Sequence, residues 1–490
     1  MTKRLILVLA FALIVGLAVS AYAEVQNVKV SGDLLLRAIN RSQFTLTDSW
    51  DGDNTKYKAA GLTSQMRLRV DADLTDNVST TIRLINERAW GSGLSLYEPG
   101  AFFMEDGIRI TDGQYLQGAV SIWDNPIEVD LAYVTLKEFL YSPLTLTLGR
   151  QELRFGNALI VGDSDTNMYA GAYGIPFDLS LKKSFDAIRA NLDYSPWVLD
   201  LVYAKLNEND VWWLQNLVNY CPEKNDADLY GINAAWDMKA LGITGKTDLY
   251  YWRKENKLLW SDSDGSYNKD VVNTIGALVS GQLIDRLTGS LEIAWQFGKA
   301  PVDLTDLNDS NSKRRAMAIQ AMLNYAFDKK GAPTLGFCYT YLSGDNKADD
   351  KNKFWDPMFE DQTPNNIVNA ILPNSGVQAF NLTGSIKPKD DLVLAMNFGY
   401  YMLPVKPKDS FYVPSPYGVD DFTFHDVGES HSGKNRILGS ALDLTATYDY
   451  TEDVQLGLTW GMFKPGKAFD REEGFKRTAT QLIGSMKVTF

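Results

Sequence analysis

The sequence predicts an all-β fold, a transmembrane antiparallel β-barrel of about 18 strands with short periplasmic turns and long extracellular loops. Three observations predict it. Apolar and polar residues alternate along most of the chain, the alternating segments are about ten residues long, and their connections are alternately short and long. Alternation with a period of two gives each strand one apolar and one polar face. A segment of about ten residues can cross a bilayer as a tilted strand.

The composition of the 490 residues excludes several other classes of protein. The net charge is −13, whereas proteins that bind nucleic acid are normally basic, so no nucleic-acid partner is expected. A mean hydropathy of −0.20 is too polar for a bundle of membrane helices. The chain has 2 cysteines and 2 histidines, which rules out a disulfide framework and a site built from several histidines.

The N-terminus carries a targeting segment. Two basic residues precede an apolar run from Leu5 to Val19, and Ala21 and Ala23 form a small-x-small cleavage site. These features predict a signal peptide over residues 1–23, cleaved after Ala23, and an outer-membrane β-barrel over 24–490. A membrane anchor is the alternative, but the run is shorter than the ~18–20 residues of a spanning helix. The predicted location is the bacterial outer membrane.

The candidate strands follow one another to the C-terminus. Short turns and long polar stretches alternate between them, which is how outer-membrane barrels are built. Soluble domains seldom contain several structureless loops of 30 residues or more, although soluble sandwiches in tandem remain the alternative fold. The long stretches are 91–126, 155–184, 345–376 and 404–437. The predicted strands are 25–41, 63–74, 78–90, 127–137, 144–154, 185–194, 197–206, 227–238, 243–254, 272–282, 287–298, 313–326, 333–344, 377–387, 391–403, 438–450, 453–464 and 478–490.

Aromatic residues and the last strand agree with a membrane barrel. Tyrosines and tryptophans such as Tyr203, Trp295 and Trp460 lie near the ends of apolar faces, where barrels carry interfacial girdles. The chain ends on an apolar face formed by Val488 and Phe490. A last strand that ends on phenylalanine is similar to the assembly signal of bacterial outer-membrane proteins.

The polar face of the early strands predicts a charged lumen. If the apolar face contacts lipid, an aqueous lumen is lined by the other face. Arginine is always charged and suits carboxylates, and rings of basic residues favour anions in pores. Pairing with neighbouring acids across the wall, at little net energy, is the alternative role. Late strands carry mostly small or uncharged residues on this face. The predicted pore-lining residues are Asp33, Arg37, Arg67, Arg69, Asp71, Arg83 and Arg189.

Two stretches of sequence resemble the alginate export porin family. Residues 148–157 read L-G-R-Q-E-L-R-F-G-N, and the family closes a strand with G-R-Q-E-L-x-[YF]-G. Residues 354–359 read F-W-D-P-M-F and look like the family's inserted segment, which usually reads F-D-P-L-F. The resemblance implies an 18-stranded outer-membrane barrel whose arginine-rich constriction passes an anionic polysaccharide. It also implies that Arg150, Glu152 and Arg154 lie at the wall or the mouth.

The alternation of residues puts Arg150, Glu152 and Arg154 on the same face as Leu148. Three charges that face lipid would be costly. The strand is therefore expected to kink or bulge near Gly149, or the three residues lie above the membrane.

Candidate metal sites are weak. Asp262 and Asp264 resemble a fragment of a calcium loop, but the bidentate glutamate is missing, so a solvated acidic loop is favoured. His425 and His431 lie in one long polar stretch, where loop polarity explains them better than a metal site or a protease dyad. No cofactor is expected, apart from this weak indication of loop-bound calcium.

The expected function is that of a channel without enzymatic activity. It would pass polysaccharides, oligosaccharides or small organic anions through the arginine-containing lumen by diffusion or export. One alternative is a barrel enzyme of the lipase or protease type, for which no residue spacing argues. Another is a scaffold barrel for a periplasmic or electron-transfer partner. Outer-membrane lipid, an anionic or neutral saccharide or small-solute cargo, and periplasmic proteins are the expected partners.

Overall fold

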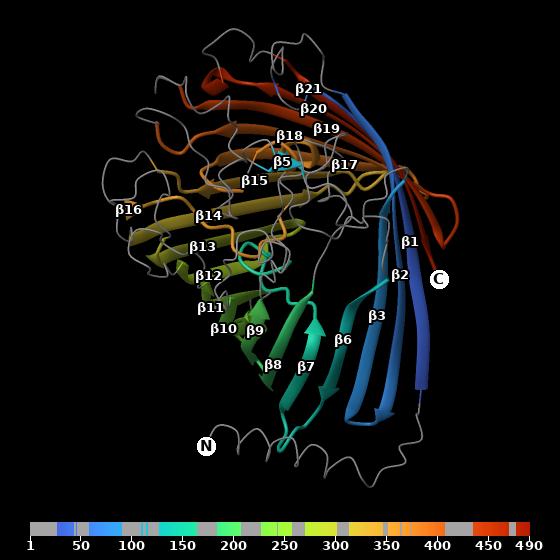
Figure 1. Ribbon diagram of the computed structural model, residues 1–490, viewed down its shortest axis with the longest axis vertical. Coiled ribbons are helices and arrows are strands. Elements are labelled where there is room, and N and C mark those ends of the chain that lie inside the picture. Colours follow the sequence, from blue (N-terminus) through green and yellow to red (C-terminus); the bar gives the residue numbers. More distant parts are fainter. Residues whose placement is uncertain are drawn as a thin grey trace.

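The computed structural model describes a closed antiparallel β-barrel of 18 strands (Figure 1). The predicted signal peptide lies outside the described residues. No helix in the described part of the chain is long and apolar enough to cross a membrane. The described residues are 27–43, 46, 58–90, 109–110, 114–115, 127–163, 184–206, 227–242, 244–256, 270–300, 313–345, 351–362, 365–372, 374–406, 435–469 and 477–490.

Each barrel strand pairs with its neighbours in chain order, and the last strand pairs with the first. The strands are β1 (Asn27–Ser42), β2 (Lys58–Thr75), β3 (Val78–Ala89), β6 (Glu128–Leu136), β7 (Leu144–Gln151), β8 (Phe185–Tyr194), β9 (Trp197–Leu206), β10 (Ala227–Asp237), β11 (Gly245–Asn256), β12 (Asp270–Ile284), β13 (Leu287–Lys299), β14 (Lys313–Ala326), β15 (Thr334–Leu342), β17 (Gln378–Lys389), β18 (Leu392–Met402), β19 (Ile437–Asp449), β20 (Val454–Pro465) and β21 (Ala479–Thr489).

Short elements lie in the connections. The strands β4 (Arg109–Ile110) and β5 (Gln114–Tyr115) form a separate hairpin, and β16 (Lys351–Asn352) pairs parallel with β14. The helices are η2 (Met238–Leu241), α3 (Asn366–Asn369) and η3 (Lys467–Phe469).

The alternation of residues explains which side of each strand faces lipid. On β13, Ile293 and Trp295 are exposed on the outer surface, whereas Glu292 and Gln296, which flank them in sequence, are buried on the inner side. The same alternation repeats around the barrel, because a strand that divides lipid from a polar interior needs opposite chemistry on its two faces. The predicted barrel is confirmed, and every predicted strand overlaps an observed one.

The two rims of the barrel differ as predicted, since short turns join the strands at one rim and long connections join them at the other. Two of the long connections do not stay outside. The chain after β7 and the chain between β15 and β17 turn back into the barrel (Figure 1). The alternation of apolar and polar residues does not predict whether a connection turns into the barrel, because the alternation stops where the strand ends.

Candidate pore

Two segments of connecting chain lie inside the barrel. The first inserted segment comprises residues 152–163, which follow β7. The second inserted segment comprises residues 351–377, of which 363–364 and 373 are not described. Phe155 of the first lies 4.9 Å, between ring centroids, from Trp252 on the inner face of β11. This contact places the first inserted segment against the inner wall.

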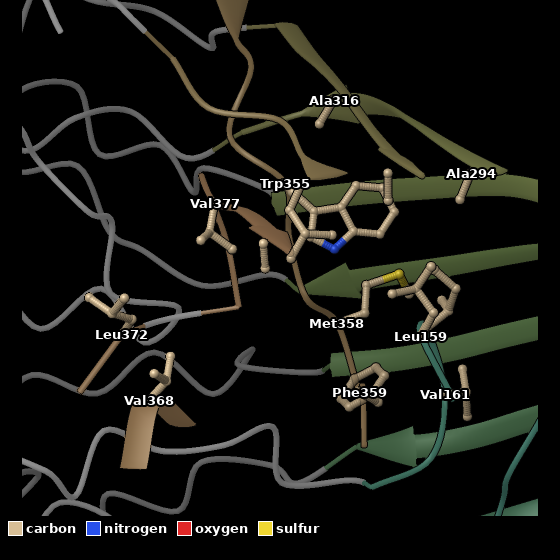
Figure 2. Close-up of a cluster of buried hydrophobic side chains, with 14 of the residues drawn as sticks. Leu159, Val161, Ala294, Ala316, Trp355, Met358, Phe359, Val368, Leu372 and Val377 are labelled. Carbon is tan, nitrogen blue, oxygen red and sulfur yellow. The ribbon is translucent and has the colours of Figure 1, made fainter. Parts of the chain in front are cut away.

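The inserted segments share one apolar core. Figure 2 shows Leu159 and Val161 of the first segment beside Met358 and Phe359 of the second. All four side chains are buried, and Trp355 is 2% exposed. Complete burial of a side chain of this size contributes roughly 1.5–3 kcal/mol, so the two segments stabilise each other by hydrophobic contact.

Backbone hydrogen bonds also join the two segments. The amide of Phe359 donates to the carbonyl of Ile160 at 3.0 Å, and the amide of Gly162 donates to the carbonyl of Phe359 at 2.6 Å. Gly162 is required for this approach, because a Cβ atom there would lie 2.6 Å from the Cβ atoms of both Ala158 and Asp361. The two segments are therefore joined by backbone hydrogen bonds as well as by hydrophobic contact.

Asp356 fastens the second inserted segment to the inner wall. Both of its carboxylate oxygens lie 2.8 Å from Nζ of Lys254 on β11. Nη2 of Arg314 on β14 lies 3.7 Å from Oδ2 and forms a second ion pair with Asp270 at 2.9 Å. Gln296 on β13 donates to the carbonyl of Asp356 at 2.7 Å and accepts from its amide at 2.8 Å.

The charge on Asp356 is maintained by its neighbours. Burial by itself would raise the pKa of this carboxyl, but the ammonium of Lys254 and the guanidinium of Arg314 more than offset that effect. Hydrogen bonds from Lys254 and from the amide of Met358 act in the same direction. The pKa of Asp356 therefore lies below its ordinary value, and the carboxylate stays ionised at neutral pH.

Further polar contacts hold the inserted segments over the wall. Gln320 on β14 donates to the side chain of Gln362 at 2.8 Å, and Gln362 donates to the carbonyl of Asn157 at 2.6 Å. Asp443 on β19 accepts from the amide of Asn366 at 2.6 Å, at the start of α3. Polar wall residues on β13, β14 and β19 are thus covered by the segments and hydrogen-bonded to them.

The inner face of β1 and β2 stays partly exposed at Arg67 and Arg69, whereas Gln65 on the same face of β2 is buried. Nε and Nη2 of Arg67 bond both carboxylate oxygens of Asp33, with distances of 2.9–3.2 Å. Nε and Nη2 of Arg69 bond Asp71 at 2.8 Å each. The side chains of Arg67 and Arg69 are 23% and 34% exposed. In each guanidinium, Nη1 has no partner among the described residues and keeps two free N–H donors.

The neighbouring charged residues lie deeper in the wall. Arg83 on β3 pairs with Asp130 on β6 and reaches Glu152 of the first inserted segment at 2.7 Å. Arg189 on β8 pairs with Asp200 on β9 at 2.8 Å. Its guanidinium carbon also lies 5.2 Å from the ring centroid of Phe155. These arginines link the wall to the first inserted segment.

Other predicted site residues are placed as follows. Arg37 lies on the inner face of β1, opposite Thr63 in the register with β2. Arg150 lies opposite Asp186 on β8 and pairs with it at 3.2 Å. Asp186 shares its face with Ile188, which is exposed on the outer surface, so this pair lies outside the barrel at the long-connection rim.

Glu152 and Arg154 follow the end of β7 and turn inward. Glu152 bonds Arg83, and Arg154 pairs with Asp361 of the second inserted segment. The register of β7 with both neighbours continues without a bulge past Gly149, although this glycine has a φ of +118°. Glu152 and Arg154 do not face lipid because the strand ends before them, not because it bulges, whereas Arg150 faces outward at the rim and pairs with Asp186.

The expected contrast between charged early strands and uncharged late strands is too strong. Late strands also place charges on the inner face, because the alternation there contains more acids and bases than the sequence interpretation included. These inward residues are Lys246, Asp248, Lys254, Glu292, Arg314 and Asp443.

The sequence interpretation also missed what holds the second inserted segment. It identified the motif that contains Asp356, but not Lys254, Gln296 or Arg314 as its partners. One signal was present, since in Lys313-Arg314-Arg315 a strand places charges on both faces. The partners themselves lie 102, 60 and 42 residues from Asp356 in sequence, and no local pattern links them.

No group of three or more potential metal ligands occurs among the described residues. Asp262, Asp264, His425 and His431 lie outside the described residues. The weak prediction of loop-bound calcium therefore stays a prediction.

Comparison with known proteins gives a family. The family model described as alginate export matches residues 56–482. No curated protein matches the sequence.

Solved structures with a similar fold are outer-membrane barrels. The outer membrane protein OpdK from Pseudomonas aeruginosa has a TM-score of 0.52 and 10% identity, over 94% of this chain and 99% of that one. OpdQ from Pseudomonas aeruginosa has a TM-score of 0.50 and 12% identity, over 96% and 99%. At these identities the likeness concerns the fold alone. The family match covers most of the chain and agrees with the closed barrel, so this protein belongs to the alginate export family and is a porin-type channel of the bacterial outer membrane.

Proposed function

We propose that the channel passes anionic solutes, namely saccharides or small organic molecules that carry carboxylates, along the inner face of β1 and β2. The observation that supports this path is the partial exposure of Arg67 and Arg69, in contrast to the inner wall beneath the inserted segments. Gln296 and Gln320, on the opposite strands, are buried beneath the inserted segments. A solute that crosses the barrel would therefore meet the two guanidinium groups.

The geometry of the two arginines suits transient binding of carboxylates. Each guanidinium is oriented by its own aspartate through Nε and Nη2, which leaves Nη1 free to donate to a passing anion. Asp33 and Asp71 also lower the net positive charge, so an anion is not held tightly. Conduction requires sites that bind weakly enough to release the solute.

Reversal potentials in planar bilayers test the proposal. In a KCl gradient, the R67A/R69A variant is expected to prefer anions less than the wild type does. The chloride-to-potassium permeability ratio should fall by roughly two- to fivefold, which is the effect expected of charged pairs that are partly exposed. An added dicarboxylate is expected to bind the two arginines of the wild type and reduce its chloride current. R67K/R69K keeps the charge but loses the planar guanidinium group, so it should keep the chloride preference and lose this block. R286A, which removes an exposed arginine at the short-turn rim, serves as the matched control.

An unchanged permeability ratio in R67A/R69A would exclude this inner face as the selective path. The proposal is of a passive channel and includes no catalytic step. Its cargo is expected to be saccharide or small organic anion, and the polymer that gives the family its name is one member of that class.

A further inference from the structure

A row of basic residues lies on the outer surface of the barrel at the long-connection rim. Lys299 on β13 is directly opposite Lys313 on β14, and Arg315 lies two residues further along β14 on the same face. All three side chains are exposed. Lys351 of β16 is the register partner of Lys313 on the side away from β13. We define the basic patch as Lys299, Lys313 and Arg315.

The basic patch lacks neutralising groups in the described part of the chain. None of its three residues has an ion-pair or hydrogen-bond partner among the described residues. Asp270 and Asp356 belong to nearby strands and segments, but both turn inward and pair with Arg314. Like charges directly opposite each other on neighbouring strands are destabilising. Among the described residues the arrangement is therefore unfavourable by itself, and an anion that lies against it would stabilise it.

The rest of the same rim shows the contrast. On β7 to β11, outward charges are neutralised within the protein, by the pairs Arg150–Asp186 at 3.2 Å, Lys205–Asp228 at 3.5 Å and Arg253–Glu255 at 3.0 Å. The two regions adjoin along the rim, since Arg253 and Arg315 are linked through successive register partners on β12 and β13. Among the described residues at this rim, the basic patch instead places exposed charges of one sign side by side.

The position of the basic patch relative to lipid identifies its ligand. Trp295 and Phe297 are 57% and 44% exposed and lie on the outward face of β13, below Lys299. Each step of two residues along a strand rises by about 7 Å, so Lys299 lies about one such step above Phe297. Aromatic residues of this kind mark the edge of the hydrocarbon region. The patch thus lies at the level of lipid headgroups, at the rim with long connections, which faces the cell exterior in such barrels.

We propose that the basic patch binds the phosphate groups of the phosphorylated glycolipid that forms the outer leaflet of the outer membrane. The acyl chains of the lipid would lie along the exposed apolar face below the patch, which includes Ile293, Trp295 and Met317. A phosphate supplies the negative charge that the patch lacks and accepts hydrogen bonds from lysine and arginine together. This lipid site is separate from the solute path, because it lies on the opposite side of the barrel wall.

Binding of lipid A by the full barrel tests the proposal. The wild type in mixed micelles is incubated with lipid A that carries both phosphates or with dephosphorylated lipid A, and retained lipid is measured by native mass spectrometry. Phosphorylated lipid A should be preferred, and K299Q/K313Q/R315Q should lose affinity by on the order of a hundredfold, since each basic residue near a charged lipid surface contributes severalfold. Dephosphorylated lipid A should bind equally to both.

The matched control removes the same charge at the opposite rim. Lys330, Lys387 and Lys389 are exposed at the short-turn end, and K330Q/K387Q/K389Q should retain lipid A as the wild type does. Equal loss in this control, no loss in K299Q/K313Q/R315Q, or equal binding of both lipids by the wild type would each overturn the proposal. Heat-dependent migration in gels verifies that the barrel has formed. If the triple variant does not assemble, K313Q alone, which removes a like-charge contact, should still weaken binding severalfold.

Discussion

On β2, the inward side chains of Arg67 and Arg69 are 23% and 34% exposed, whereas on β14 the inward side chain of Arg314 is 7% exposed. All three occupy the same face of the wall, and each pairs with an aspartate. They differ in what covers them, because the inserted segments lie over β11 to β14 and leave β2 open. An inward charge that the inserted segments cover therefore anchors those segments. An inward charge that they do not cover can contact a solute.

Removing the charge of Asp356 should have the largest effect on the difference between the covered and the exposed parts of the inner wall. D356N leaves Lys254 with an uncompensated positive charge in a buried site, whereas Arg314 keeps its pair with Asp270. Breaking such a buried pair costs about 3–5 kcal/mol. The second inserted segment should detach from the wall, so single-channel conductance and cleavage by an added protease within 351–362 should both increase. D328N, which breaks the exposed pair with Arg286 at a turn, is the control. Wild-type conductance in D356N would show that the apolar core alone holds the segment.

A smaller effect is expected where the two inserted segments meet. G162A places a Cβ atom 2.6 Å from two other Cβ atoms, neither of which can rotate away. Overpacking of this kind costs roughly 1–3 kcal/mol. Hydrogen exchange of the amides of Gly162, Phe359 and Asp361 should accelerate. G484A on β21 is the matched control, since nothing lies within 4 Å of a Cβ atom at that glycine.

The pH dependence of the covered side follows from Asp356. Its pKa in the folded protein lies below the ordinary value of 3.8. A carboxyl with a lowered pKa stabilises the fold above that ordinary value and loses this contribution as the pH falls through the folded pKa. Protease cleavage of the second inserted segment should stay constant from pH 5 to 8 at about the neutral-pH level and rise only below about pH 3.8. D356N should abolish that transition, and a rise between pH 5 and 7 would assign the anchoring to another group.

The open side should give the smallest effect. D33N/D71N keeps Arg67 and Arg69 but removes the carboxylates that partly neutralise them. The chloride-to-potassium permeability ratio should increase by roughly twofold, because exposed ion pairs contribute about 0.2–1 kcal/mol. The ratio is read from the reversal potential in a salt gradient. A lower ratio would mean that the aspartates orient the guanidinium groups more than they neutralise them.

The sequence alone determined the barrel. Alternation places Ile293 and Trp295 outward and Glu292 and Gln296 inward, and each such choice depends only on neighbours along one strand. The sequence could also predict that Arg67 pairs with an acid across the wall, because Asp33 lies on the polar face of the adjacent strand. With lipid on one side and polar surroundings on the other, a ten-residue strand has about one orientation in which each face meets the surroundings that suit it.

Only the tertiary structure decided which part of the inner wall stays open. Asp356 meets Lys254 and Arg314 because the chain between β15 and β17 turns into the barrel, and the core of Trp355 with Leu159 forms only after that turn. The same holds for the basic patch, whose lysines become neighbours through the register of β13 and β14. Local alternation fixes the face of each residue, whereas burial and pairing depend on segments that are distant in sequence and are joined only when the barrel closes.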